Sequence, residues 1–245
     1  MILHGDVLKE MSTIEDDSID CIVTSPPYNK KGLLGKSKPT NQIWGKFEID
    51  YDDYGDDIPE WQYQLWMIDV LDEMHRVIKP TGSIFFNHKP RRHKSRAHLP
   101  TDFISKSDAE LYQLIIWNRR NSPNIRNDIL VPCTEHIYWL CKDKPKVFRN
   151  NIHPDFRGEV WTIIADKQKE HPAPFPEQLV RNCIMLTTEY GDKILDPFLG
   201  SGTTCVVAKE VERECIGIEM SKKYYELSKR RIDDTEQTRF VLGSR

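Results

Sequence analysis

The fold class follows from one stretch in the last third of the chain: Lys193-Ile194-Leu195-Asp196-Pro197-Phe198-Leu199-Gly200-Ser201-Gly202-Thr203-Thr204. Its first residues are typical of a short buried strand, and its two glycines mark a tight loop before a helix that begins at Cys205. A second strand over Cys215–Ile218 and a second helix over Ser221–Ile232 follow. This order predicts an α/β fold with a doubly wound, mostly parallel sheet, whose ligand crevice lies at the strand ends.

The glycine loop allows three interpretations as a binding site. A phosphate loop needs Lys after the last glycine, where Thr203 stands, and a dinucleotide fingerprint wants Gly or Ala in place of Cys205. A nucleoside without phosphates, such as S-adenosylmethionine, needs only the tight turn. Glu219 ends the next strand, where its carboxylate can accept hydrogen bonds from both ribose hydroxyls. The glycine loop and Glu219 together favour a nucleoside cofactor without phosphates. The alternative is that the loop is a purely structural turn.

A second stretch, Thr24-Ser25-Pro26-Pro27-Tyr28-Asn29, follows the β-branched run that ends at Val23. The two prolines stop that strand because neither can donate to a ladder and both φ angles are fixed. A rigid strand end then presents the Ser25 hydroxyl, two carbonyls and the Tyr28 ring. Such a cradle suits a planar group that carries an amine, and the alternative is a simple turn.

The remaining elements fit the same sheet. A helix is expected from Pro59 to Lys79, a strand over Ser83–Asn87, and a helix from Glu177 to Thr187. Leu114–Trp117 and His136–Leu140 are two further strands that could pair with each other. Residues 30–58 lose any periodic pattern, and we expect a mobile loop there.

Composition bounds the class of protein. The chain has 245 residues, 38% of them hydrophobic and 30% charged, which predicts one soluble domain over 1–245. It has no apolar run of membrane-spanning length and no signal-peptide pattern, so a cytoplasmic or nucleoid-associated protein is expected. The net charge of −3 means that any nucleic-acid surface must be local.

The six cysteines are scattered without a C-x-x-C pair, so we expect reduced core residues, with neither disulfides nor a metal site. Pro132-Cys133 matches the dipeptide that carries the nucleophile of enzymes methylating carbon 5 of cytosine. No partner Glu-Asn-Val motif exists, and a core cysteine is favoured. Ser25 lacks the G-x-S-x-G elbow of an acyl-transfer nucleophile.

Thr24–Tyr28 and Asp196–Thr203 together closely resemble the two motifs of amino-methylating DNA methyltransferases of restriction–modification and phage type. The catalytic motif comes first and the cofactor loop last, which resembles the β group, a circular permutation of the Rossmann-like methyltransferase fold. The resemblance covers nearly the whole chain. It implies methyl transfer from S-adenosyl-L-methionine to the exocyclic amine of a base flipped out of duplex DNA.

The resemblance also implies roles for individual residues. Ser25 and the Pro26 carbonyl would accept hydrogen bonds from the amine, Tyr28 would stack on the base, and Pro27 completes the catalytic set. Glu219 would bind the ribose and Asp6 the adenine edge. The implied cofactor-binding residues are Asp6, Phe175, Asp196, Phe198, Gly200, Ser201, Gly202, Thr203 and Glu219.

Substrate and partners are finer expectations. Ser25 in the first motif position favours cytosine-N4 over the alternative, adenine-N6; an RNA or protein methyltransferase and an inactive DNA-binding module are further alternatives. Insertions 88–110 and 119–160 are basic and expected to contact DNA, although such runs can equally be solvated faces. A homodimer and a cognate restriction endonuclease are partners that such a family would allow. The expected DNA-contacting residues are Lys89, Arg91, Arg92, Arg119, Arg120 and Arg126.

Overall fold

The computed structural model describes residues 1–29, 59–93, 96–120, 127, 129–164 and 175–235. The expected loop over 30–58 and Arg126 lie outside the described residues.

One eight-stranded sheet organises the fold, in the order β1-β10-β9-β2-β3-β7-β6-β8. β7 is antiparallel to both of its neighbours, and every other neighbouring pair is parallel. This arrangement confirms the predicted mostly parallel α/β sheet. The strands are β1 Ile2–His4, β2 Ile19–Thr24, β3 Ile78–His88, β6 Glu110–Asn118, β7 Thr134–Cys141, β8 Val160–Thr162, β9 Lys193–Asp196 and β10 Glu214–Glu219; β4 Arg91–His93 and β5 Arg96–His98 form a separate ribbon.

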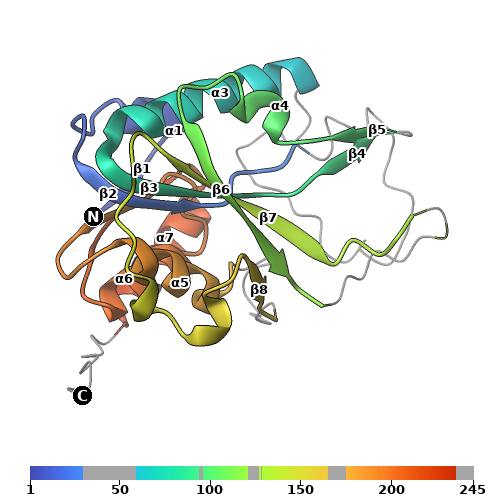
Figure 1. Ribbon diagram of the computed structural model, residues 1–245. Coiled ribbons are helices and arrows are strands. Elements are labelled where there is room, and N and C mark those ends of the chain that lie inside the picture. The colour runs from blue at the N-terminus through green and yellow to red at the C-terminus, as the bar shows by residue number, and fades with distance from the viewer. Residues whose placement is uncertain (30–58, 94–95, 121–126, 128, 165–174, 236–245) are drawn as a thin grey trace.

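Helices cover both faces of the sheet (Figure 1). One face carries α1 Val7–Met11, α3 Glu60–Val77 and α4 Thr101–Ile104. The other carries α5 Glu177–Thr187 and α6 Thr203–Glu210, with α7 Lys222–Asp233 packed against α6.

Successive side chains of β2 and β3 alternate between two hydrophobic cores. Ile22 and Phe86 belong to the core under α3, whereas Val23 and Phe85 belong to the core with α5 and α6. All six residues of β2 are buried, which explains why its central residues, Cys21–Val23, are apolar on both faces of the sheet.

The predicted elements are found with small shifts of their ends. The helix expected to reach Lys79 ends at Val77, because Ile78 already pairs with Ile19 of β2 and β3 begins there rather than at Ser83. The two strands expected to pair do so as β6 and β7. The helix over Glu177–Thr187 has the predicted bounds, whereas β8 and the β4–β5 ribbon were not predicted.

The two halves of the chain meet where β2 lies beside β9. Cys21 pairs with Ile194 and Ile22 with Leu195, although the two strands are far apart in the chain. From this pair the sheet grows in one direction through β3 and in the other through β10. The ends of β2 and β9 therefore form the switch point at which a doubly wound sheet binds ligands.

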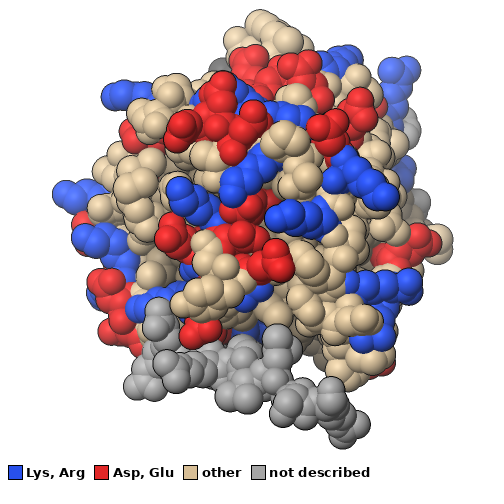
Figure 2. All heavy atoms as spheres, turned by 60° about the vertical axis from the view of Figure 1, so that its left-hand side comes forward, with Lys and Arg blue, Asp and Glu red and all other residues tan. Residues whose placement is uncertain are grey.

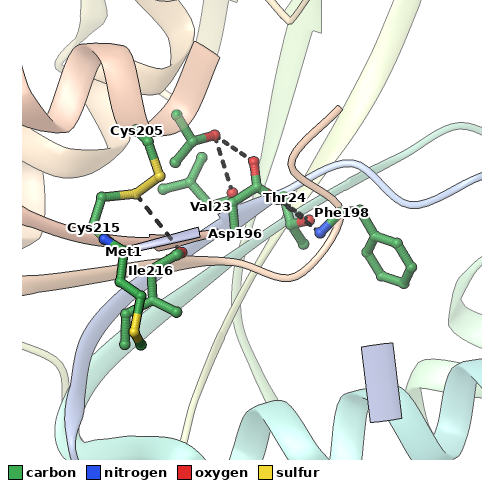
Figure 3. Close-up of a disulfide and its surroundings, with 9 residues drawn as sticks. Met1, Val23, Thr24, Asp196, Phe198, Cys205, Cys215 and Ile216 are labelled. Atoms are coloured by element: carbon green, nitrogen blue, oxygen red, sulfur yellow. Dashed lines mark hydrogen bonds between the residues drawn. A yellow bond between two sulfur atoms is a disulfide. The ribbon is translucent and has the colours of Figure 1, made fainter. Parts of the chain in front are cut away.

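The cysteine prediction was wrong for one pair, since Cys205 and Cys215 form a disulfide between the start of α6 and the start of β10 (Figure 3). Helix and strand pack together and bring the two Cα atoms to 5.3 Å, a proximity that their ten-residue separation does not reveal. Cys21, Cys141 and Cys183 are free and buried, as expected. Burial raises the pKa of the Cys21 thiol to about 12. Cys133 is only partly buried, contrary to the expectation of a core residue.

Surface charge is mixed on the side of the molecule shown in Figure 2, which faces left in Figure 1. Lys and Arg side chains there are interspersed with Asp and Glu. In the described part of the chain, no helix is both long and apolar enough to cross a membrane.

Candidate active site

Asp196 ties the two predicted motifs together at the switch point (Figure 3). Its Oδ1 accepts hydrogen bonds from Thr24 Oγ1 at 2.7 Å and from the Phe198 N–H at 3.1 Å, and its Oδ2 accepts from Thr204 Oγ1 at 2.6 Å. Burial raises the pKa of Asp196 to about 6, although these three hydrogen bonds oppose the shift. The end of β2 and the glycine loop are thus held by one buried carboxyl group.

The glycine loop depends on positive φ angles. Gly200 has φ +53° and Gly202, which caps α6, has φ +89°. A Cβ on Gly202 would lie 2.9 Å from the Cβ of Ser228 on α7, so a larger residue would be strained in its backbone and would force α7 to shift. Arg231 of α7 donates to the carbonyl of Ser201 at 2.7 Å and to its Oγ at 3.0 Å. The Ser201 side chain is therefore engaged by α7.

Glu219 closes the other side of this loop. Its Oε2 accepts from the Gly200 N–H at 2.7 Å and its Oε1 from the Ser221 N–H at 2.8 Å. Burial is the largest influence on the Glu219 carboxyl and raises its pKa. Each carboxylate oxygen keeps a second lone pair, so a ribose diol can be accepted at both oxygens.

The other expected cofactor residues lie around this carboxylate or near it in the fold. The Gly5 N–H donates to the Glu219 carbonyl at 3.2 Å, which sets the adjacent Asp6 beside the end of β10, where its Oδ1 caps α1. Phe198 is partly exposed and contacts Trp66 edge-on, with ring centroids 5.7 Å apart. Phe175, also partly exposed, packs against the core under α5. Thr203 is buried in the first turn of α6.

These residues fit a nucleoside cofactor. A partly buried carboxylate at a strand end matches neutral ribose hydroxyls and repels a phosphate, and loop residues 197–203 contain no Lys or Arg to offset its charge. Within the described ranges, no group of three or more His, Cys, Asp or Glu side chains is placed to hold a metal ion.

The Ser25 hydroxyl lies in a hydrogen-bonded cluster at the end of β2. Ser25 Oγ is 3.0 Å from the Tyr28 hydroxyl, and Asn87 Nδ2 donates to both, at 3.4 Å and 3.0 Å. The Tyr28 hydroxyl donates to Glu135 Oε2 at 3.3 Å. The Tyr28 ring lies against His88, with centroids 4.4 Å apart.

The two proline carbonyls differ in their partners. The Pro27 carbonyl accepts from the Tyr63 hydroxyl of α3 at 2.8 Å. Among the residues that the structure describes, no donor reaches the Pro26 carbonyl. The Pro26 oxygen is therefore the one available to a bound molecule.

Sequence reasoning missed Asn87 and Glu135, which are 1% and 6% exposed. Asn87 ends the apolar run of β3, and a buried amide at a strand end is a signal that could have identified it. Glu135 precedes the apolar run of β7. Because β7 is antiparallel, its first residues lie at the same edge of the sheet as the last residues of β3, and only the strand pairing reveals this.

Four of the six expected DNA-contacting cations fall into two groups. Lys89 and Arg119 both approach Glu135 Oε1, at 3.6 Å and 2.9 Å, beside the catalytic motif. Arg92 and Arg120 are exposed.

Arg91 lies inside the protein, contrary to its expected place on the surface. Its side chain is 3% exposed, and it donates to both carboxylate oxygens of Glu60, at 2.7 Å and 2.6 Å. The guanidinium also lies 4.6 Å from the centroid of the Tyr63 ring. Arg91 therefore joins the β4–β5 ribbon to the first turn of α3 in this structure.

The fold and the paired motifs define a permuted Rossmann-like methyltransferase. The family model of the N6/N4 DNA methylases matches residues 19–230, and the chain belongs to this family. It is an S-adenosyl-L-methionine-dependent DNA amino-methyltransferase.

Relatives cover nearly the whole chain. The type II methyltransferase M.BglII of Bacillus subtilis is 29% identical over 93% of this chain and 67% of its own. The DNA adenine methyltransferase YhdJ of Escherichia coli is 28% identical over 95% of this chain and 82% of its own.

Two solved structures share the fold. The PvuII DNA methyltransferase, which is cytosine-N4-specific, matches with a TM-score of 0.77 and 21% identity over 97% of this chain and 87% of its own. TTHA0409 of Thermus thermophilus, solved with S-adenosyl-L-methionine, matches with a TM-score of 0.66 and 22% identity over 95% of this chain and 96% of its own.

Proposed function

We propose that this enzyme methylates the N4 amine of cytosine in duplex DNA. The observation that carries the proposal is the Ser25 hydroxyl, which stands in the first position of the catalytic motif and within 3.0 Å of the Tyr28 hydroxyl. Thr24, the preceding residue, is bonded to Asp196 of the cofactor loop. The amine-holding group and the donor-holding loop are therefore coupled through one pair of adjacent strands.

The amine would be held by two acceptors. Ser25 Oγ accepts one N–H and the Pro26 carbonyl accepts the other, which leaves the nitrogen lone pair directed away from both. S-adenosyl-L-methionine supplies an activated methyl group on its sulfonium sulfur. The protein contributes orientation of the amine and stabilisation of the charge that develops on it, and no covalent enzyme intermediate is required.

The remaining residues have supporting roles in this proposal. Glu219 accepts from the ribose hydroxyls, Asp6 from the adenine edge, and the Gly200–Gly202 backbone follows the methionine portion. The Tyr28 ring stacks on the flipped base, whose extrusion costs a few kcal/mol. Lys89, Arg92, Arg119 and Arg120 approach the phosphates near the site.

Adenine-N6 methylation is the second candidate, because the same two acceptors suit either exocyclic amine. YhdJ is named for adenine and the PvuII enzyme for cytosine-N4, so the relatives favour neither base. An RNA or protein substrate is less well supported, since the family is one of DNA methylases.

The test is to express the chain in a host without DNA methylation and digest the recovered DNA to nucleosides for mass spectrometry. We expect N4-methylcytosine, and its absence from cells expressing Ser25→Ala serves as the control. If N6-methyladenine is found instead, the enzyme methylates adenine, which is the second candidate. The proposal is refuted if the DNA contains no methylated nucleoside and the purified enzyme instead transfers the labelled methyl group of S-adenosyl-L-methionine to RNA or protein.

A further inference from the structure

Glu135 is a buried carboxylate next to the amine-holding motif that the proposed mechanism has not used. It lies at the start of β7, beside the ends of β3 and β6. One oxygen, Oε1, is paired with Arg119 at 2.9 Å and faces Lys89 at 3.6 Å. The other, Oε2, accepts from the Tyr28 hydroxyl at 3.3 Å and from Asn87 Nδ2 at 3.2 Å.

A carboxylate can only accept, and this property orients every hydroxyl proton that leads to it. The Tyr28 hydroxyl has one proton, which it donates to Glu135. The phenol oxygen is then an acceptor, and it receives the Ser25 hydroxyl proton at 3.0 Å together with an Asn87 N–H at 3.0 Å. The chain of donors therefore runs from Ser25 through Tyr28 to Glu135.

The direction of this chain matters for the target amine. With its proton directed at Tyr28, Ser25 Oγ presents lone pairs and can accept an amine N–H. Without the carboxylate, the Ser25 proton is free to turn and donate to the amine nitrogen. That bond would occupy the lone pair on which methyl transfer depends.

We propose that Glu135 is a positioning residue that makes Ser25 an obligate acceptor, acting through the Tyr28 hydroxyl. This inference rests on the proposed function, because it concerns how the same site holds the amine. Asn87 supports the arrangement, because its two Nδ2 hydrogens are shared among Ser25 Oγ, the Tyr28 hydroxyl oxygen and Glu135 Oε2, at 3.4, 3.0 and 3.2 Å. Glu135 touches neither the base nor the cofactor in this mechanism.

The test compares full-length wild type with Glu135→Gln, Tyr28→Phe and the double variant, using single-turnover transfer of labelled methyl to unmethylated DNA. Glu135→Gln leaves one neutral amide oxygen for the four donors that shared the carboxylate, and Tyr28→Phe removes the hydroxyl that links the carboxylate to Ser25. Each single variant should therefore lower the rate roughly tenfold to a hundredfold, the range for a hydrogen bond to a charged group. The double variant should be no slower than the slower single variant, because both substitutions break the same chain of hydrogen bonds from Ser25 to Glu135. Glu110→Gln, at the far end of the β6–β7 hairpin, is the matched control and should keep the wild-type rate.

Two binding measurements separate this role from a structural or electrostatic one. The dissociation constant for S-adenosyl-L-methionine should stay within about twofold of wild type in Glu135→Gln. Affinity for DNA should not fall, because the substitution releases Lys89 and Arg119 from their ion pairs. A loss confined to DNA affinity, with the rate at saturating DNA unchanged, would overturn the proposal.

Other outcomes are equally decisive. Rate losses that multiply in the double variant would mean that Glu135 acts independently of Tyr28. If Glu135→Gln does not fold, Tyr28→Phe decides alone, since it leaves the carboxylate and both its cations in place; an unchanged rate overturns the inference. A wild type that methylates no DNA refutes the proposed function and the inference with it, whereas an active wild type with fully active variants refutes the inference only.

Discussion

Asp196 is a buried carboxyl group whose replacement by Asn should change how stability depends on pH. Its pKa in the folded protein is about 6, against about 3.9 for Asp in an unfolded chain. Between these pH values the folded state holds a proton that the unfolded state has lost, so the free energy of unfolding falls as pH rises. The contribution of Asp196 to the free energy of unfolding is complete below about pH 4 and is lost as pH rises through about 6.

The size of the effect follows from the difference between the two pKa values. A difference of about 2 corresponds to about 3 kcal/mol, since each pKa unit is worth about 1.36 kcal/mol. Asn is a matched replacement: its Oδ1 can keep the hydrogen bonds from Thr24 and Phe198, and its Nδ2 can donate to the Thr204 hydroxyl. The variant should therefore gain about 3 kcal/mol over wild type between about pH 4 and pH 7.5.

The assay is urea denaturation of both proteins at several pH values across that range. All other groups titrate in both proteins, so the difference isolates Asp196 and the part of the Glu219 pKa shift that its charge causes. Asp108 is exposed, so Asp108→Asn is the control, and its free energy of unfolding should depend on pH as that of wild type does. A difference between wild type and Asp196→Asn that stays constant from about pH 4 to pH 7.5 would contradict the reasoning.

Three further substitutions separate the cofactor site, the internal ion pair and the DNA surface, and a fourth tests the glycine loop. Gly202→Ala should cost about 1–3 kcal/mol in urea denaturation, because alanine is strained at φ +89°. Glu219→Gln should weaken S-adenosyl-L-methionine binding roughly tenfold or more by calorimetry, as a charged hydrogen-bond acceptor is lost. Arg91→Ala should cost about 3 kcal/mol of stability, since it leaves the Glu60 carboxylate unpaired. Arg120→Ala should keep stability, weaken DNA binding, and lower its salt dependence by about one charge.

For each variant, one result would contradict the reasoning. If Gly202→Ala is as stable as wild type in urea, the loop adopts another conformation. If Glu219→Gln binds S-adenosyl-L-methionine with wild-type affinity, Glu219 does not belong to the cofactor site. If Arg91→Ala lost DNA affinity at full stability, the arginine would belong to the DNA surface after all. If Arg120→Ala changed neither affinity nor salt dependence, that residue would be a solvated side chain.

The predictable features of this protein are those whose causes are local. The prolines at 26 and 27 end a strand through their own geometry, and Gly202 is required by one backbone angle. Glu219 was found from its place at the end of a strand, and the helix over Glu177–Thr187 from the proline-rich segment that precedes it. Because such signals need only a few neighbouring residues, the sequence alone predicted the fold class and the two motifs.

The remaining features depend on which elements become neighbours in space. Glu135 reaches the catalytic motif only because β7 runs antiparallel to β3. Arg91 was expected on the surface, but the β4–β5 ribbon and α3 enclose it with Glu60, and packing of α6 on β10 brings Cys205 to Cys215. These contacts join residues from separate elements, so no local pattern specifies them. The sequence determined that Ser25 stands at the end of a rigid strand. The tertiary structure decided which carboxylate orients its proton, because strand pairing places Glu135 within hydrogen-bond distance of Tyr28.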